Sequence, residues 1–286
     1  MQAMVDWKKI YVKRRRWAHK GEFGRLLVVG GSESLTGSPT FNAFAALRTG
    51  TDLVTVCAPR RAADVAAYFL PDVMSVPLDA RFLKPSHEKT VLSLAEKSSA
   101  VCVGSGLGRR PETRRAVVDL VKKLRKPVVV DADGVRALAG KAFVLRGRQA
   151  VLTPHADEFR ELTGRRVGEV LEERIQEAKA AAASFDCVVV LKGSVDVVTD
   201  GKRVFLNKTG SPLLTKGGFG DTLAGVCGAF LARGTASFEA ACAAAELNGL
   251  AGELAAEKYG EAVLASDLFQ CFAEVVARKS RKSCQH

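Results

Sequence analysis

Residues 112–134 read ETRRAVVDLVKKLRKPVVVDADG, and this stretch decides the fold class. Over 112–126 apolar residues recur at helical spacing between charged ones, which predicts an amphipathic helix. A short continuous valine run follows and ends at Asp131, which predicts a strand buried on both faces. A helix that leads directly into such a strand is the building unit of an α/β fold with a parallel sheet.

The same alternation recurs on both sides of this unit. Further strands are predicted at 25–31, 52–59, 100–106, 150–154 and 187–193, and further helices at 39–50, 86–98, 167–185 and about 221–233, 236–258 and 266–279. Between two β-branched runs in VDVVTDGKRVFLN (195–207) stands Asp-Gly, which is a strong hairpin signal. We therefore expect one α/β domain over residues 1–286, with a mostly parallel central sheet and an antiparallel edge hairpin. The small residues of 236–258 suit either a closely packed core or an interface between subunits.

The formal net charge is +12, from 43 Lys+Arg against 31 Asp+Glu. Residues 1–25 carry +6 of it and residues 273–286 carry +3, so we expect basic tails, about 1–18 and 277–286, outside a nearly balanced body. A basic protein raises the alternative of a nucleic-acid-binding protein. The sequence has no helix-turn-helix pattern and no aromatic-rich RNA motif, so no nucleic acid is expected as a partner.

The seven cysteines form no CxxC pair, which is typical of structural thiols in a reducing compartment. No signal peptide is visible, and no apolar run approaches the roughly 18 residues of a membrane span. We expect a cytoplasmic protein without a membrane partner.

The strongest chemical signal is KGGFGD (216–221), which stands directly before an apolar helix. Backbone N–H groups at such a helix start form an anion site, and Asp221 is then a catalytic base for phosphoryl transfer. The alternative is a plain glycine-rich turn in which Asp221 caps the helix, worth about 1 kcal/mol. The pattern is not a Walker A loop, because Lys216 precedes the glycines.

Other chemistry-bearing residues follow the predicted strands, where α/β folds bind ligands. Glycines follow the strand at 100–106, in VGSGLGR. Asp131 either binds Mg²⁺ through water or, with Asp133, caps a helix. His155 and Glu158 face one cleft or form a helix cap, and Lys192 binds phosphate or is a solvated turn residue.

Seven segments in this order together resemble the ADP- or ATP-dependent NAD(P)H-hydrate dehydratases, over about residues 19–270. They are HKGEFGRLLVVGGS (19–32), TGSPTFNAFAALRTGTDLVTV (36–56), VGSGLGR (103–109), VVVDADG (128–134), LTPHADEF (152–159), VLKG (190–193) and NKTG…KGGFGDTLAG (207–225). The resemblance implies a ribokinase-like three-layer fold and a repair reaction: the C6 hydroxyl of the S-form of hydrated NADH or NADPH is phosphorylated from ADP or ATP, and phosphate is eliminated. It also implies a hydro-lyase that uses Mg²⁺ and forms a homo-oligomer, dimer or tetramer. The epimerase domain that this family often carries is expected to be absent.

The resemblance also assigns roles to residues. Asp221 would be the base at the substrate hydroxyl. The hydrated dinucleotide would contact Asn42, Ala43, Gly106, His155, Glu158 and Asp221. The nucleotide would be held by Lys192, Gly193, Ser194, Val195, Asp196, Gly218, Phe219 and Gly220.

The glycine loop departs from the family pattern. Ser211, Leu213 and Leu214 stand where the family usually has Asn, Gly and Met, and Lys216 and Phe219 each replace a Thr. Phe219 removes a hydroxyl from the loop, whereas Lys216 either takes over part of the phosphate binding or points to solvent. The nearest alternative function is a small-molecule kinase of the same superfamily, similar to hydroxyethylthiazole kinase.

Overall fold

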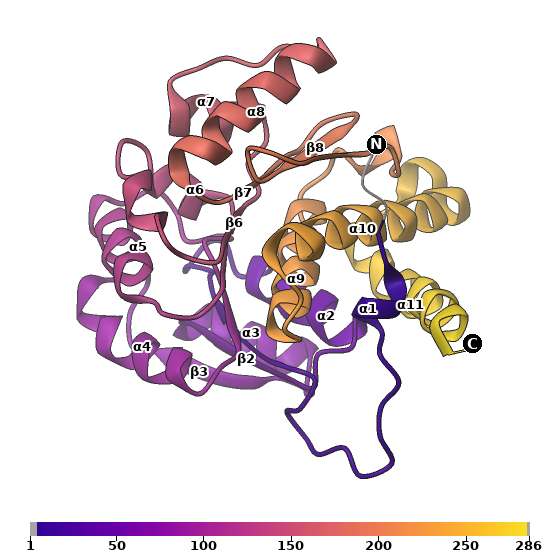
Figure 1. Ribbon diagram of the computed structural model, residues 1–286. Coiled ribbons are helices and arrows are strands. Elements are labelled where there is room, and N and C mark those ends of the chain that lie inside the picture. Colours follow the sequence, from indigo (N-terminus) through magenta and orange to yellow (C-terminus); the bar gives the residue numbers. More distant parts are fainter. Residues whose placement is uncertain (1–4, 285–286) are drawn as a thin grey trace.

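The computed structural model describes residues 5–284, with only the backbone at 282–284, and shows one nine-stranded sheet between two layers of helices (Figure 1). The strands are β1 (Arg25–Val29), β2 (Leu53–Pro59), β3 (Met74–Leu78), β4 (Ala100–Val103), β5 (Val128–Val130), β6 (Ala150–Leu152), β7 (Val188–Leu191), β8 (Asp196–Thr199) and β9 (Val204–Asn207). The helices are α1 (Trp7–Ile10), α2 (Ser38–Arg48), α3 (Arg60–Phe69), α4 (Glu88–Glu96), α5 (Pro111–Lys123), α6 (Asp133–Ala137), α7 (Ala156–Thr163), α8 (Leu171–Phe185), α9 (Phe219–Ala232), α10 (Ser237–Tyr259) and α11 (Leu268–Cys284). Short 3-10 helices lie at Pro85–His87, Ala142–Leu145, Pro212–Leu214, Gly260–Ala262 and Ala265–Asp267.

The strand order is β3-β2-β1-β4-β5-β6-β7-β8-β9. The neighbours from β3 to β7 are parallel, and β8 and β9 add an antiparallel hairpin at one edge. The expected α/β class and the Asp-Gly hairpin are therefore confirmed. Strand β3 and helix α3 were not predicted from the sequence. The strand signal at MSVPL (74–78) is weak, because the segment contains Pro77 and only one β-branched residue.

Alternate side chains of the central strands enter two different cores. In β1, Leu26 and Val28 belong to the core that also contains side chains of α2, α3, α9, α10 and α11, whereas Leu27 and Val29 belong to the core that contains side chains of α4, α5, α7 and α8. All four side chains are at most 1% exposed. A strand that is buried on both faces reads as a continuous apolar run, which is why the sequence marked these strands clearly.

Helix α9 is the central helix of the first core and carries the glycine-rich loop at its N-terminus. It packs directly on α2: a Cβ built at Gly225 would lie 2.2 Å from the carbonyl oxygen of Asn42. Only glycine permits this approach of two helix backbones. The small residues of α10, such as Ala244 and Ala251, are buried inside the chain as well, so they serve the core.

The expected N-terminal tail is wrong for residues 7–11. Ile10 and Tyr11 are buried in the first core, and Trp7 stacks on Tyr11 with its ring centroid 5.9 Å away. The Arg233 guanidinium fixes this segment by donating to the carbonyls of Gly50 (2.7 Å) and Ile10 (3.0 Å). The apolar side chains between the lysines account for the difference, because they pack inward while the lysines face solvent. At the other end, α11 extends through the basic residues to Cys284, so residues 277–284 continue a helix; residues 1–4 and 285–286 lie outside the described chain.

No helix within the described residues is long and apolar enough to cross a membrane. The cysteines whose side chains are described, Cys57, Cys102, Cys187, Cys227, Cys242 and Cys271, are all free and buried. Their packing agrees with structural thiols.

Candidate active site

The predicted site residues gather where the parallel strands end. Gly106 follows β4, Asp131 follows β5, His155 follows β6 and Lys192 follows β7, and the N-terminus of α9 approaches them from the first core. Because parallel strands end at the same edge of a sheet, residues far apart in the sequence meet here.

The glycine loop delivers the free N–H groups of α9 to this edge. Gly218 has φ +101°, and a Cβ there would lie 2.7 Å from the Ala265 Cβ, so both backbone and space require glycine. The helix begins at Phe219, and its first internal hydrogen bond runs from the Thr222 N–H to the Gly218 carbonyl (3.0 Å). The N–H groups of the first turn have no acceptor in the helix, which is the geometry that the predicted anion site requires.

Asp221 stands in this first turn and is held by α2. The Asn42 side-chain amide donates to the Asp221 carbonyl (2.7 Å). Burial, assisted by the charge of Asp131, raises the pKa of the Asp221 carboxyl to about 7, although hydrogen bonds with Ser38 and Ser105 limit the rise. A carboxyl group that titrates near neutrality is suited to accept a proton in a reaction.

Lys192 places a positive charge next to the anion site. A Cβ built at Gly220 would lie 3.3 Å from its Nζ, so the ammonium faces the first turn of α9. Nζ lies 3.3 Å from Asp131 Oδ1 and 3.7 Å from Glu158 Oε2. Burial disfavours the ammonium, but the two carboxylates outweigh it and raise the Lys192 pKa. Lys192 therefore stays charged and is not a freely solvated turn residue.

The Asp131 carboxylate is already satisfied by protein groups. Oδ1 accepts from Thr153 Oγ1 (2.7 Å) and Lys192, and Oδ2 accepts from Ser105 Oγ (3.0 Å). No group of three or more His, Cys, Asp or Glu side chains that could hold a metal ion occurs within residues 5–284. The residues present therefore do not form a direct Mg²⁺ ligand set at Asp131.

The backbone directly after Asp131 is strained. Ala132 has φ +50° and ψ −120°, a conformation that costs an L-residue about 1–3 kcal/mol. Asp133 then starts α6 and accepts the Gly108 N–H (2.8 Å), so the Asp-Ala-Asp turn connects the loops after β4 and β5.

His155 and Glu158 form a capping box at the start of α7. His155 Nδ1 accepts the N–H groups of Asp157 (3.1 Å) and Glu158 (3.4 Å), and Glu158 accepts the His155 N–H (3.0 Å). The pKa of Glu158 falls to about 2: burial opposes ionisation, but hydrogen bonds from His155 and the charge of Lys192 outweigh it. The cap is therefore real, and a ligand contact by the half-exposed His155 ring stays a prediction.

Arg136 lies against two residues of the candidate site and was not predicted from the sequence. Its guanidinium is 8% exposed, pairs with Glu161 and lies 3.7 Å from Glu158 and 3.4 Å from His155 Nε2. Its position three residues after Asp133 on α6 was the only signal in the sequence.

The residues predicted to contact the substrate differ in their accessibility to solvent. Asn42 and Ala43 lie inside α2 with 1% and 0% exposure, and Asn42 contacts Asp221 and Ser105 (3.3 Å). Gly106 has φ +69° and lies against the Leu35 carbonyl oxygen. The Asn42 amide thus holds the Asp221 backbone, and contacts of Asn42, Ala43 and Gly106 with a substrate stay predictions.

A cavity of about 440 Å³ opens between the turn after β7 and α9. Six residues predicted for nucleotide binding line it: Lys192, Gly193, Ser194, Asp196, Phe219 and Gly220. Val195 and Gly218 do not line it, although both adjoin residues that do. The lining also includes Leu214, one of the departures from the family pattern, and Thr209 and Asn248, which were not predicted as site residues.

Asp196 orders the turn in front of this cavity. Its carboxylate accepts the Gly193 N–H (3.0 Å) and the Asn207 amide (3.0 Å). Burial raises the Asp196 pKa, against the effect of these hydrogen bonds.

The two departures in the glycine loop have structural roles. Lys216 donates to the carbonyls of Glu261 and Val263 (2.9 Å). It therefore fastens the loop to the segment after α10 and is not free in solvent, whereas phosphate binding by Lys216 stays a prediction. Phe219 is 5% exposed and extends the first core up to the cavity.

Comparisons with known proteins identify the family of this chain. The family model described as NAD(P)H-hydrate dehydratase matches residues 26–273. The bifunctional NAD(P)H-hydrate repair enzyme of Pyrobaculum aerophilum is 41% identical over 280 residues, which are 97% of this chain and 55% of that protein. The chain thus spans about half the length of that relative. The ADP-dependent (S)-NAD(P)H-hydrate dehydratase of Cenarchaeum symbiosum is 36% identical over 275 residues, 95% of this chain and 94% of that one.

A solved structure extends the agreement to three dimensions. The ADP/ATP-dependent NAD(P)H-hydrate dehydratase of Bacillus subtilis, co-crystallised with ATP/Mg²⁺, has a TM-score of 0.81 and 28% identity over 96% of each chain. The ribokinase-like three-layer fold implied by the sequence is therefore confirmed. The matched segment contains the glycine loop, Asp221 and Lys192, and this chain belongs to the NAD(P)H-hydrate dehydratase family.

Proposed function

We propose that this chain dehydrates the S-form of hydrated NADH and NADPH at the expense of ADP or ATP, as a hydro-lyase of cytoplasmic metabolite repair. One observation carries the proposal: a carboxyl group with a pKa near neutrality, Asp221, shares a site with the free N–H groups of α9 and the Lys192 ammonium. Base, anion site and cation are the three groups that phosphorylation of a hydroxyl needs. The family membership and the Cenarchaeum relative support the same substrate.

The proposed reaction has two steps. Asp221 accepts the proton of the C6 hydroxyl of the substrate. The hydroxyl oxygen meanwhile attacks the terminal phosphorus of ADP or ATP. The bond from that phosphorus to the bridging oxygen breaks, and the shortened nucleotide leaves with the electron pair. Phosphate then leaves C6 with the C–O electron pair, a proton is lost from C5, and the ring double bond is restored. The products are NAD(P)H, phosphate and AMP or ADP.

The chain's own groups have distinct parts in this scheme. The N–H groups of Gly218, Phe219 and Gly220 surround the transferring phosphoryl group, and residues 192–196 hold the nucleotide in the 440 Å³ cavity. The hydrated ring is proposed to lie between Asp221, Gly106 and His155, over α2 at Ala43. Asn42 keeps Asp221 in place through its hydrogen bond to the Asp221 carbonyl, and Glu158 keeps Lys192 in place as an ion-pair partner.

Mg²⁺ is proposed to enter as a complex with the nucleotide. Its hard oxygen ligands would be the phosphates, because the described residues provide no cluster of their own. A homo-oligomer, dimer or tetramer, stays a prediction from the family resemblance.

The assay that tests the function incubates the protein with S-hydrated NADH, Mg²⁺ and either ADP or ATP. Recovery of the near-ultraviolet absorbance of the dihydronicotinamide, with one phosphate released per turnover, is the expected result. A stable phosphorylated alcohol would instead indicate a kinase similar to hydroxyethylthiazole kinase. Dehydration that proceeds equally without nucleotide would contradict the proposal.

The rate should depend on pH through Asp221. The carboxyl must be ionised to accept a proton, and its pKa is about 7. We therefore expect kcat/KM to be constant well above pH 7 and to fall about tenfold per pH unit below it. A pH profile of kcat/KM at saturating nucleotide measures this limb, and a flat profile down to about pH 5 would show that Asp221 is not the base.

A further inference from the structure

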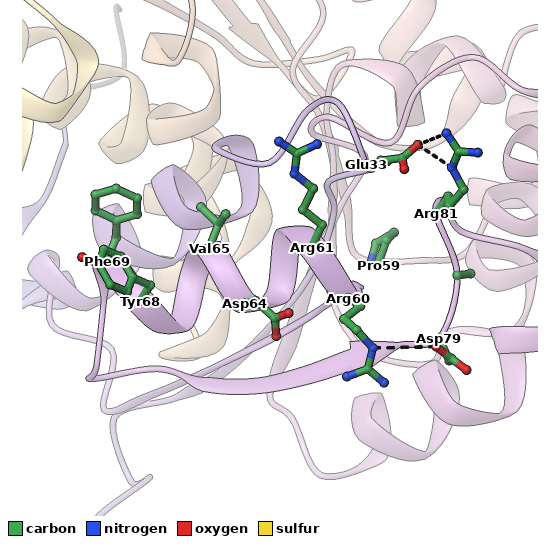
Figure 2. A pocket seen from close by; sticks show the side chains of 11 residues that line it. Glu33, Pro59, Arg60, Arg61, Asp64, Val65, Tyr68, Phe69, Asp79 and Arg81 are labelled. Carbon is green, nitrogen blue, oxygen red and sulfur yellow. Dashed lines mark hydrogen bonds and ion pairs between the residues drawn. The ribbon is translucent and has the colours of Figure 1, made fainter.

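A second cavity, of about 720 Å³, lies at the same edge of the sheet beside α3. We call it the α3 groove. Its lining comes from the ends of β1, β2 and β3 and from one face of α3: Glu33, Pro59, Arg60, Arg61, Asp64, Val65, Tyr68, Phe69, Asp79, Ala80 and Arg81. Figure 2 shows it with α3 running along its length. The reaction proposed above uses no residue of this groove.

The chemistry of the groove changes along α3. Three arginines stand at the end near the strand termini: Arg60, Arg61 and Arg81. At the other end Tyr68 and Phe69 are 83% and 67% exposed, with ring centroids 5.3 Å apart in a T-shaped pair (Figure 2). From Arg61 to Tyr68 the helix rises by about 10 Å. One end thus suits anionic groups, and the other suits a planar aromatic ring.

The charged side chains of the groove are only partly paired with one another. Arg60 pairs with Asp79 at 3.7 Å with both side chains more than half exposed, and Arg81 pairs with Glu33. Exposed pairs of this kind contribute little stability, so a ligand can replace them. Arg61 and Asp64 form no side-chain hydrogen bond or ion pair with any residue from 5 to 284.

The segment from Gly30 to Ser38 contacts both α3 and Gly106. The Gly31 N–H donates to the Ser105 carbonyl (2.8 Å), and a Cβ at Gly31 would lie 2.7 Å from the Ala62 Cβ on α3. On its other side the segment touches Gly106 through the Leu35 carbonyl. Strands β4 and β2 are two positions apart in the sheet, which is about 10 Å.

We propose that the α3 groove binds the adenosine diphosphate half of the hydrated dinucleotide substrate. Moving away from Asp221 one meets Gly106, then the arginines, then the aromatic pair. A dinucleotide presents its parts in the same order: the nicotinamide ring, the pyrophosphate and the adenine. The volume lies within the usual range for ligand pockets, roughly 300–1,000 Å³. The inference rests on the proposed function and adds the place of the substrate's distal half.

Asp64 adds a preference between the two substrates. A carboxylate next to the adenosine ribose accepts a hydrogen bond from a 2′-hydroxyl and repels a 2′-phosphate. The groove therefore favours hydrated NADH over hydrated NADPH, with Arg60 and Arg61 reducing the difference.

The test compares a complete and a truncated substrate. Arg61→Gln is expected to raise the KM for hydrated NADH about tenfold, and Tyr68→Ala roughly fivefold. Neither should change the KM for the hydrate of reduced nicotinamide mononucleotide, which lacks the distal half, nor the KM for ADP. Asp64→Asn should raise kcat/KM for hydrated NADPH relative to hydrated NADH by roughly threefold. The control is Arg114→Gln, an exposed helix-surface arginine on α5.

The outcomes separate this inference from the proposed function. A wild-type protein without dehydratase activity would overturn the proposed function itself. An active wild type whose Arg61→Gln and Tyr68→Ala variants keep the KM for hydrated NADH would overturn the groove assignment alone. An increased KM for ADP in these variants would place the second nucleotide in the groove instead and also contradict it.

Discussion

Asp221→Asn is expected to lower kcat for dehydration by about 10²–10⁴-fold while the protein keeps its fold and binds nucleotide. The amide has nearly the shape of the carboxyl but cannot accept the substrate proton. Residue 221 keeps its place in the first turn of α9, and its backbone carbonyl still accepts the hydrogen bond from Asn42. Single-turnover measurements with ADP would give the loss directly.

The same variant has a predicted effect on stability. Because the folded-state pKa of Asp221 is raised to about 7, the free energy of unfolding falls as the pH rises from about 4, the ordinary carboxyl pKa, to about 7, and the whole loss is present above pH 7. Asp221→Asn should therefore unfold at a higher temperature than the wild type at pH 8, with a smaller difference at pH 5. Asp157→Asn, an exposed carboxylate on α7 that pairs with Arg160, is the matched control. Dehydration at the wild-type rate in Asp221→Asn would refute the assignment of the base.

Lys192→Met is expected to cost about 3–5 kcal/mol of unfolding free energy at neutral pH. Asp131 and Glu158, which are 2% and 5% exposed, lose the ammonium that faces both of them. The loss should shrink as the pH falls, because the unpaired carboxylates then take up protons. Urea unfolding at pH 7 and pH 5 measures both values. Activity should fall as well, since the site loses its cation at the first turn of α9.

Two companion variants make this second prediction decisive. Lys208→Met removes an exposed lysine in the turn after β9 and should leave stability within about 0.5 kcal/mol of wild type. In the double variant Lys192→Met/Asp131→Asn one of the uncompensated charges is gone, so part of the stability should return. If the double variant were less stable than either single variant, the charge argument would be wrong.

Helical periodicity and continuous apolar runs sufficed to predict most of the sheet, because strands buried on both faces consist of uninterrupted valine and leucine. Edge strand β3 escaped, since it is half-exposed and contains Pro77. The N-terminal helix was not predicted for a related reason: Lys8 and Lys9 stand between Trp7 and Ile10, and the basic run 13–16 follows, so basic residues dominate the composition of this segment. Local sequence patterns indicate which face of a helix or strand is buried. They indicate little about short terminal segments that pack against the core.

The candidate site divides in the same way. Asp221 and Lys192 could be predicted, because each follows a clear strand or loop signal. The partners that set their charges could not: Asp131 meets Lys192 across 61 residues, and Arg136 reaches Glu158 from a different helix. For Lys216 the sequence suggested phosphate or solvent, and the carbonyls it binds lie 45 and 47 residues away. Pairings of this range are decided by topology.

The hydrogen bond from Asn42 to the Asp221 carbonyl joins residues 179 positions apart, and it has a consequence for biosynthesis. A nascent chain that has not yet released α9 from the ribosome holds α2 with its apolar face, including Ala43 and Ala46, without its packing partner. In the same unfinished chain only one face of β1 is covered, although both faces of this strand are apolar. Folding that depends on such distant contacts is slow and leaves apolar surface open in the interim. Exposure to aggregation and chaperones is therefore concentrated in the interval before α9 is translated, and Asp221 joins Lys192 and Gly106 only once that helix has been made.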